Sequence, residues 1–311
     1  MSADAALLRE LEPVVAAEVD RHMSIAKEWF PHQYVPWGRG TDFDGAFEGP
    51  AWDAEQSPID EVSRTALVVN LLTEDNLPSY HREIDGSFGS DGAWGFWTGR
   101  WTAEEARHGI VIRDYLTVTR AVDPIALERE RMTHMTTGFV SAYERDIVHT
   151  VAYVSFQELA TRISHRNTGR HTEDAGLEAM LARVALDENL HMIFYRNVAA
   201  AVLEADPDRM VPAIRDVVTD FSMPGAGVEG FTRRALTIAM AGIYDLRIHH
   251  DEVLAPVLRA WGIEQLEGLG GEAEKAREEI MAFMAELDQQ ASRFVEQRDA
   301  RRARHAARAE A

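Results

Sequence analysis

The chain has 311 residues, with 52 acidic against 32 basic side chains, a formal net charge of −20 and no cysteine. The lack of cysteine excludes disulfide bonds, cysteine-based zinc or iron–sulfur sites, and thiol nucleophiles. The acidity argues against a general nucleic-acid-binding or anionic-membrane surface, because both need a positive potential. No apolar run approaches the roughly 20 residues of a membrane-spanning helix, and the charged N-terminus (Asp4, Arg9 and Glu10) does not resemble a signal peptide. We therefore expect a soluble protein of the cytoplasm.

Apolar side chains recur with helical spacing between clusters of proline and glycine, and alternating strand-like runs are scarce. The pattern predicts an all-α protein that forms a single domain over residues 1–311. The expected helices lie at 4–28, 58–83, 91–120, 124–131, 138–170, 173–204, 208–220, 229–260 and 272–300. Pro124 after Asp123, and Pro207 after Asp206, mark the first turns of two of them.

Two segments stand outside this helical pattern. Residues 29–58 form an irregular stretch rich in aromatic side chains, which argues that it packs over the helices and is not a disordered linker. The basic tail, residues 298–311, contains five arginines. We expect a frayed, solvated end there, with a partner-binding arm as the alternative.

Four of the expected helices carry a carboxylate in the middle of an otherwise apolar face. Read in steps of three and four residues, the first and third of these helices each present one such residue, Glu74 and Glu158. An isolated buried carboxylate is costly and is normally paired or protonated. The chain has only two lysines, Lys27 and Lys275, so a metal ion is the natural counter-charge.

The second and fourth of these helices each carry a Glu-x-x-His pair. The pairs are Glu105 with His108 and Glu188 with His191. Residues three apart lie one turn apart on a helix, so both side chains of a pair can reach one ion. A carboxylate oxygen and an imidazole nitrogen suit iron or manganese, with oxygens left over to bridge two ions.

The spacing between helices carries more weight than the pairs alone. Glu74 lies 31 residues before Glu105, and Glu158 lies 30 residues before Glu188. Two helices that give one Glu and two that give Glu-x-x-His supply the ligand set of ferritin-like carboxylate bundles with two iron or manganese ions. Four carboxylates also balance two divalent ions. The sequence therefore predicts a ferritin-like di-iron four-helix bundle core with additional flanking helices.

Other acidic residues stand close to these candidate ligands. Asp187 directly precedes Glu188, and Glu104 directly precedes Glu105. Either could accept the outer N–H of a ligating histidine from across the bundle, although a solvated helix face is an equal alternative for Glu104. The His-His-Asp-Glu run at 249–252 suggests a second metal cluster. Adjacent residues on a helix diverge by about 100 degrees, however, so a solvated or inter-helix face is favoured there.

Several motifs make a resemblance to a known family specific. They are Trp-Thr-Ala-Glu-Glu-Ala-Arg-His-Gly at 101–109, and shorter matches at 29–31, 73–80, 155–165, 187–191 and 222–224. On these residues the chain resembles the soluble acyl-acyl-carrier-protein desaturases, the family of the plant stearoyl enzyme, and more closely the bacterial members. The matches run in order over about residues 20–260.

The resemblance implies a set of site residues. Two iron ions, with manganese as an alternative in either site, would be bound by Glu74, Glu105, His108, Glu158, Glu188 and His191. Thr161 would be a proton-delivering hydroxyl on the oxygen-binding side, although a hydroxyl bonded to its own helix backbone is an equal alternative. An electron path would run through Trp29, Asp187 and His108. Arg107 would lie alongside this path, and simple packing is the alternative for Trp29.

The resemblance also implies an activity. The protein would introduce a cis double bond into a fatty acyl chain on acyl carrier protein, using O2 and electrons from a ferredoxin-type donor. It would be a homodimer. The alternatives are a di-iron hydroxylase or N-oxygenase on the same bundle, a non-catalytic iron-handling protein, and a metal-free helical interaction protein.

One departure from the plant pattern concerns the docking of the carrier. Plant members present basic residues just before the Trp-x-Pro segment, where this chain has only Arg21, His22 and Lys27, interspersed with acidic residues. A body with a charge of −20 should repel an acidic carrier. Either a local arginine cluster docks the carrier, or the acyl chain is carried differently.

Overall fold

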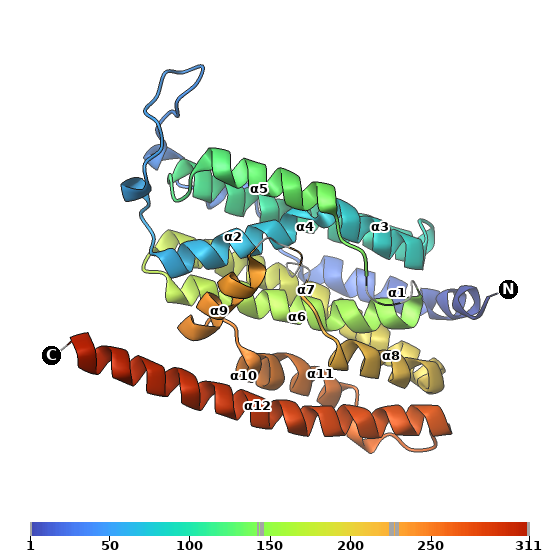
Figure 1. Cartoon of the computed structure of the whole chain (residues 1–311). Coiled ribbons are helices and arrows are strands. Elements are labelled where there is room, and N and C mark those ends of the chain that lie inside the picture. The colour runs from blue at the N-terminus through green and yellow to red at the C-terminus, as the bar shows by residue number, and fades with distance from the viewer. Residues whose placement is uncertain (1, 142, 144–145, 224–226, 228–229, 310–311) are drawn as a thin grey trace.

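The computed structural model describes residues 2–141, 143, 146–223, 227 and 230–309, and Figure 1 shows an all-helical molecule. The main helices are α1 (Ala3–Ile25), α2 (Glu61–Asp75), α3 (Leu77–Phe88), α4 (Gly92–Val118), α5 (Pro124–Thr137), α6 (Ile147–His171), α7 (Ala175–Ala205), α8 (Pro207–Thr219), α9 (Phe231–Ala241), α10 (Leu246–Ile248), α11 (Ala255–Ala260) and α12 (Gly271–Ala309). Shorter elements are η1 (Pro31–Gln33), η2 (Trp37–Arg39), η3 (Ala54–Gln56), the π-helical η5 (His249–Leu254) and η6 (Ile263–Gln265). The all-α prediction is confirmed. No helix among the described residues is long and apolar enough to cross a membrane.

Helices α2, α4, α6 and α7 form the four-helix core, in which each helix packs against two of the others (Figure 1). Asp60 and Asp174 cap the N-termini of α2 and α7 by accepting backbone N–H bonds. Helix α1 lies against α4 and α7, and α8 lies between α6 and α12. One buried apolar cluster reaches from Leu7 in α1 to Leu287 in α12, so the flanking helices share the core of the bundle.

The helix expected over 58–83 is divided in two at Asn76. Pro78 occupies the second position of α3. Its ring cannot continue α2, because proline lacks an N–H and clashes with the carbonyl of the residue four positions earlier. Helix α2 therefore ends at Asp75, and Glu74 lies in its last turn.

Two further expected helices are shortened or broken at glycines. Gly138 has a φ of 71° and ends α5, and α6 begins only at Ile147 rather than at residue 138. Gly242 has a φ of 78° and ends α9. The helix expected over 229–260 is therefore a series of four short elements, α9, α10, η5 and α11. Both glycines have a positive φ, which other residues rarely adopt, and Gly242 is in the left-handed αL conformation that commonly ends helices.

The aromatic segment 29–58 packs against the bundle only in part. Trp29 is 3% exposed and Val35 is also buried. Trp52 donates a hydrogen bond from Nε1 to the carbonyl of Arg120, 2.9 Å away. Phe47, by contrast, is 81% exposed, and the loop around it projects from the bundle (Figure 1). The expectation of a segment packed over the bundle is thus wrong for this loop, where glycine, proline and acidic residues leave few apolar groups to bury.

The basic tail differs from the expectation of a frayed end. Helix α12 continues to Ala309 instead of ending near residue 300. Arg298 pairs with Asp245 at 2.5 Å, and Arg302 donates to the carbonyl of Met240. The tail consists mainly of alanine and arginine, which have high helix propensity, and these contacts connect Arg298 and Arg302 to the start of α10 and to α9.

Candidate metal centre

The six candidate ligands converge inside the four-helix core, and each is 7% exposed or less. They fall into two groups, and the ligand atoms of each group lie within 4.8 Å of one another. One group is Glu74, Glu105, His108 and Glu188; the other is Glu105, Glu158, Glu188 and His191. Glu105 and Glu188 belong to both groups, so each can offer an oxygen to two adjacent ions. The groups otherwise differ by one carboxylate and one imidazole each.

The distances between ligand atoms show how compact the cluster is. His108 Nδ1 lies 3.3 Å from Glu105 Oε2 and 3.2 Å from Glu188 Oε1. His191 Nδ1 lies 2.7 Å from Glu105 Oε1 and 3.4 Å from Glu158 Oε2. Both histidines therefore point the same nitrogen, Nδ1, toward the carboxylates.

Several of these inward-facing atoms have no hydrogen-bond partner among the described residues. They are Glu105 Oε1, His108 Nδ1, Glu158 Oε2, Glu188 Oε1 and His191 Nδ1. Buried polar atoms without a partner are rare and call for an explanation such as a bound ion. The donors are oxygen and imidazole nitrogen, with four carboxylate charges for two divalent ions. The residues present thus fit a pair of metal ions.

Crowding of the carboxylates perturbs their protonation. Burial, together with repulsion from its acidic neighbours, raises the pKa of Glu158 well above its usual range. The same causes raise the pKa of Glu105. Burial alone would lower the pKa of His191, but its hydrogen bond to Glu104 and the close carboxylates of the cluster raise it well above the usual range. The cluster therefore holds more negative charge than its own histidines can neutralise.

Glu74 behaves differently from Glu158. Burial alone would raise its pKa, but the nearby imidazole of His108 and the hydrogen bond with His165 hold that pKa well below the usual range. His165 Nε2 lies 2.8 Å from Glu74 Oε1, and Asn70 contacts the other ring nitrogen at 3.3 Å. Sequence reasoning missed His165. Its signal was available, because it lies seven residues after Glu158 on the same face of α6.

The outer side of His108 faces Asp187. Trp29 Nε1 donates to Asp187 Oδ2 at 2.6 Å, and Arg107 Nη2 donates to the same oxygen at 3.1 Å. Arg183 pairs with the other oxygen. His108 Nε2 lies 3.6 Å from Asp187 Oδ2, slightly beyond hydrogen-bond distance. The indole of Trp29 is stacked on the imidazole of His108, with ring centroids 6.3 Å apart and an interplanar angle of 11°.

The outer side of His191 faces Glu104 in the same way. His191 Nε2 lies 2.9 Å from Glu104 Oε2, and His22 Nε2 lies 3.0 Å from the same oxygen. Arg100 pairs with the other oxygen. Glu104 is 3% exposed, so the alternative of a solvated helix face is wrong. The sequence placed His22 among the basic residues near the Trp-x-Pro segment, but His22 is buried and continues the apolar face of α1 three residues after Val19.

Thr161 lies beside the cluster and makes both contacts that were considered for it. Its hydroxyl lies 3.2 Å from Glu188 Oε2. It also donates to the carbonyl of Gln157 in its own helix, at 2.8 Å. The hydroxyl is therefore within reach of the centre and is also held by the backbone.

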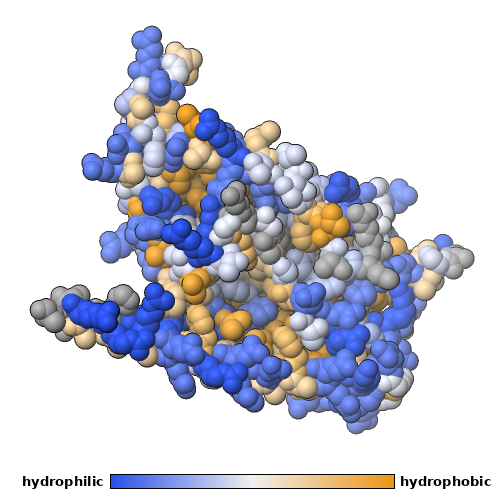
Figure 2. Space-filling model, in the orientation of Figure 1, coloured by the Kyte–Doolittle hydropathy of each residue, from blue (hydrophilic) through white to orange (hydrophobic). Residues whose placement is uncertain are grey.

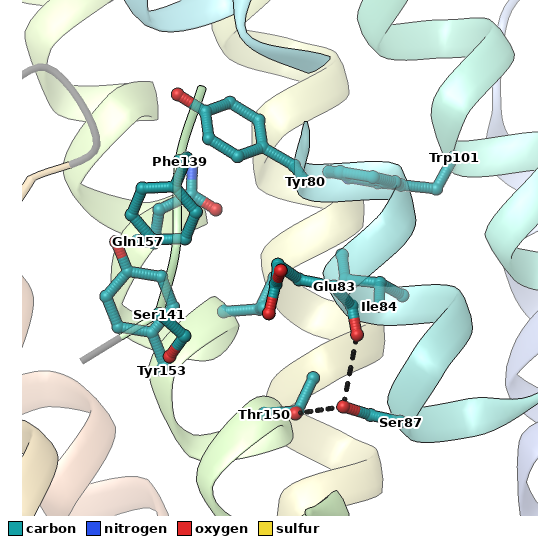
Figure 3. A pocket seen from close by; sticks show the side chains of 11 residues that line it. Tyr80, Glu83, Ile84, Ser87, Trp101, Phe139, Ser141, Thr150, Tyr153 and Gln157 are labelled. Carbon is teal, nitrogen blue, oxygen red and sulfur yellow. Dashed lines mark hydrogen bonds between the residues drawn. The ribbon is translucent and has the colours of Figure 1, made fainter. Parts of the chain in front are cut away.

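Cavities adjoin the centre from two directions. The first, between α3, α4 and α6, is shown in Figure 3 and has mainly aromatic and aliphatic walls, including Tyr80, Ile84, Phe139 and Tyr153. Trp101 separates this cavity from the ligands and donates a hydrogen bond from Nε1 to Glu158 Oε1, 3.0 Å away. Its opposite end is polar, where Thr150, Ser87 and the Glu83 carbonyl form a chain of hydrogen bonds (Figure 3).

The second cavity lies between α2, α6 and α9. Its walls include Val69, Phe231 and Ile238, and it reaches Glu74 and Thr161 directly. We call it the α2–α9 cavity. Both cavities are mainly apolar: the α2–α9 cavity reaches the cluster at Glu74, and the first cavity ends at Trp101 beside Glu158. Apolar spaces next to the ligands are the kind of site that an apolar substrate requires.

Residues 249–252 do not form a second cluster. His249 Nδ1 contacts the hydroxyl of Tyr244 at 2.9 Å, and Glu252 pairs with Arg166 at 2.6 Å. His250 bonds to Asp251 beside it. The expected inter-helix and solvated contacts therefore account for this run.

Comparisons with known proteins agree with the motifs. A profile of the fatty acid desaturase family matches residues 3–310. DesA1 of Mycobacterium tuberculosis, provisionally named an acyl-acyl-carrier-protein (acyl-ACP) desaturase, is 47% identical over 94% of this chain and 88% of its own length. The chloroplastic stearoyl-ACP 9-desaturase 2 of Oryza sativa is 30% identical over 85% of this chain and 70% of its own length. The X-ray structure of DesA2 from Mycobacterium tuberculosis superposes with a TM-score of 0.72 at 32% identity, covering 88% of this chain and 99% of DesA2. The chain therefore belongs to the fatty acid desaturase family that includes these acyl-ACP desaturases.

Proposed function

We propose that the protein is an acyl-ACP desaturase that introduces a cis double bond into a fatty acyl chain. One observation carries the proposal: six buried ligand side chains converge beside two apolar cavities, one of which reaches Glu74 while the other ends at Trp101. The reaction consumes one O2, two electrons from a ferredoxin-type donor, two protons and two hydrogen atoms of the acyl chain. It yields the double bond and two molecules of water.

The proposed cofactor is a pair of iron ions, with manganese as the alternative in either site. Glu105 and Glu188 would contact both ions, Glu74 and His108 one of them, and Glu158 and His191 the other. Bound iron supplies the activation of O2 that allows hydrogen to be taken from unactivated carbons. The donor set and the unpartnered buried atoms support this proposal.

The surrounding side chains have proposed roles in moving electrons and protons. The indole of Trp29 contacts Asp187 and stacks on His108, so it offers an electron route toward one edge of the centre. Arg107 lies over the indole, 4.9 Å from its centroid, and donates a hydrogen bond to Asp187. The Thr161 hydroxyl holds a proton at Oγ1 within reach of Glu188 and faces the α2–α9 cavity.

The cavities have the complementary role of holding the acyl chain and excluding water. A chain that passes the ligands would lie partly in each cavity, with its two reacting carbons beside the cluster. The proposal places the reaction in the cytoplasm, with soluble carrier and donor proteins. The family resemblance further implies a homodimer, which sedimentation would test.

The proposal is tested by incubating the iron-loaded protein with acyl-ACP, ferredoxin, its reductase and O2. Mass spectrometry should show a product two mass units lighter, with a cis double bond. A product sixteen mass units heavier would identify a hydroxylase on the same bundle and would contradict the desaturase proposal. Protein without iron serves as the control.

A further inference from the structure

A polar cleft opens at the surface where α2, α5 and α9 meet. Three arginines line it, Arg129 on α5 and Arg233 and Arg234 on α9. The other polar side chains include Thr65, Thr133, Thr137 and Thr237. We call this site the arginine cleft. It is lined by three arginines against two glutamates, in a chain whose net charge is −20.

The arginines of the cleft differ in their partners. Arg234 pairs with Glu130, with Nη1 and Oε1 2.6 Å apart. Arg129 and Arg233 are exposed, and the guanidinium group of neither makes a hydrogen bond or an ion pair with any residue that the structure describes. Two guanidinium groups are therefore available to an anion in the cleft. Guanidinium is well suited to phosphate, because its fork of N–H groups matches two phosphate oxygens.

The arginine cleft leads along α2 toward the metal centre. Glu61 and Thr65 line the cleft, whereas Val69 and Thr73 line the α2–α9 cavity. These four residues follow one another at intervals of four, so they lie on one face of α2. The next residue, Glu74, is a candidate metal ligand.

Helix α9 also lines both the arginine cleft and the α2–α9 cavity. Arg233, Arg234 and Thr237 line the cleft, whereas Phe231, Ala235 and Ile238 line the α2–α9 cavity. One helix thus presents cations and hydroxyls to the surface cleft and apolar side chains to the inner cavity. Figure 2 shows hydrophilic and hydrophobic surface side by side in the region of α2 and α9.

We propose that the arginine cleft binds the phosphate of the phosphopantetheine arm of an acyl carrier protein. The inference rests on the proposed function, and it identifies the surface on which that substrate docks. An acyl-phosphopantetheine arm carries an anion at one end and an apolar chain at the other. From the surface inward, the protein presents free guanidinium groups, then apolar walls, then metal ligands, which is the same order. The local positive charge also offsets the repulsion between the acidic chain and an acidic carrier.

Binding measurements on the full-length protein test this without relying on turnover. The ligands are stearoyl-loaded carrier, which has the arm, and apo-carrier, which lacks it. The variant is the double substitution Arg129→Ala/Arg233→Ala. The matched control is Arg301→Ala/Arg304→Ala on α12, which removes the same charge from exposed arginines elsewhere.

The cleft variant should raise the Kd for the stearoyl-loaded carrier by about tenfold or more, since charged contacts to phosphate are lost. It should leave the weaker binding of apo-carrier unchanged. The control variant should leave both unchanged. Circular dichroism should be the same for all variants.

Two results would overturn the inference alone. One is a cleft variant that binds the loaded carrier as the control does, while the wild-type protein still desaturates. The other is an equal loss of apo-carrier binding, since the arginines would then contact the carrier protein and not its phosphate. A wild-type protein that binds no acylated carrier would overturn the proposed function as well.

Discussion

The two sides of the metal centre are alike in their ligands and different in what lies behind them. Behind His108 stands Asp187, and behind His191 stands Glu104; each of these carboxylates also pairs with arginine. Asp187 is contacted by the indole of Trp29, whereas Glu104 is contacted by the imidazole of His22. An indole can pass single electrons, whereas an imidazole in this position can only hold its neighbour. We therefore expect electrons to enter on the His108 side.

The largest expected effect is a loss of bound iron, which should be greater for a ligand shared by both groups than for a ligand of one group. Glu188→Ala should reduce bound iron to well below one ion per chain and abolish desaturation, because Glu188 serves both groups. Glu158→Ala should retain an ion on the His108 side. Elemental analysis after iron-supplemented expression measures both. Retention of two ions by Glu188→Ala would contradict the assignment of the centre.

The same variants test whether metal stabilises the fold. Addition of ferrous iron should raise the Tm of the wild-type protein. The free energy of unfolding should increase by about 2.7 kcal/mol at a metal concentration one hundred times the Kd. Glu158→Ala should lose much of this increase. In a metal-free helical protein, Glu158→Ala would instead be more stable than wild type with or without iron.

The next effect concerns the carboxylates behind the histidines. Glu104→Ala should weaken metal binding on the His191 side by about 10- to 100-fold, as expected for loss of a group that orients a ligating imidazole. Asp187→Ala should do the same on the His108 side. Titration with a metal-binding competitor would show which ion is lost. If each variant lowered the metal affinity of both sites equally, the prediction that Glu104 and Asp187 each support one site would be wrong.

A smaller effect should distinguish Trp29 from His22. Trp29→Phe should lower ferredoxin-driven turnover by about tenfold, equivalent to about 1.4 kcal/mol in the barrier, with two ions still bound. His22→Phe should leave the rate of electron delivery unchanged. Stopped-flow reduction by ferredoxin measures this rate directly. Equal rates in wild type and Trp29→Phe would exclude the indole from the path.

The smallest effect is a pH dependence of the metal-free protein. The pKa of Glu158 is raised by burial and repulsion, so this residue binds its proton more tightly in the folded state. Stability should therefore increase, on the order of 1 kcal/mol, as the pH falls from 8 toward the unfolded-state pKa. The pKa of Glu74 is lowered, so its contribution is lost only at more acidic pH. Urea unfolding should show this slope, and Glu158→Gln should flatten it while Glu74→Gln does not.

The sequence was sufficient to predict that the six candidate ligands lie together, because most of their signal is local. Glu74 and Glu158 stand out as acids on apolar helix faces, and the two Glu-x-x-His pairs gain weight from the similar spacing between each pair and the Glu on the helix before it. Helix existence was predictable for the same reason. The break at Asn76 was not recognised, although Pro78 in its Leu-Pro-Ser setting could have indicated it.

Contacts between distant segments were not predictable. His22 and Glu104 are 82 residues apart, and Asn70 and His165 are 95 apart. From sequence alone, a histidine on an apolar helix face is interpreted as a core residue, because the side chains that it contacts on the opposite helix are not known. The arginine cleft is of the same kind, because its charges come from α5 and α9 and gather only through the packing of both against α2.

The positions of His22 and Trp29 have a further consequence. Both come from residues 22–29, the end of α1 and the short stretch after it, yet they reach opposite sides of the centre. A single segment of backbone thus supplies the side chains that contact Glu104 behind His191 and Asp187 behind His108. A change in the position of this segment would therefore alter the surroundings of both histidines together.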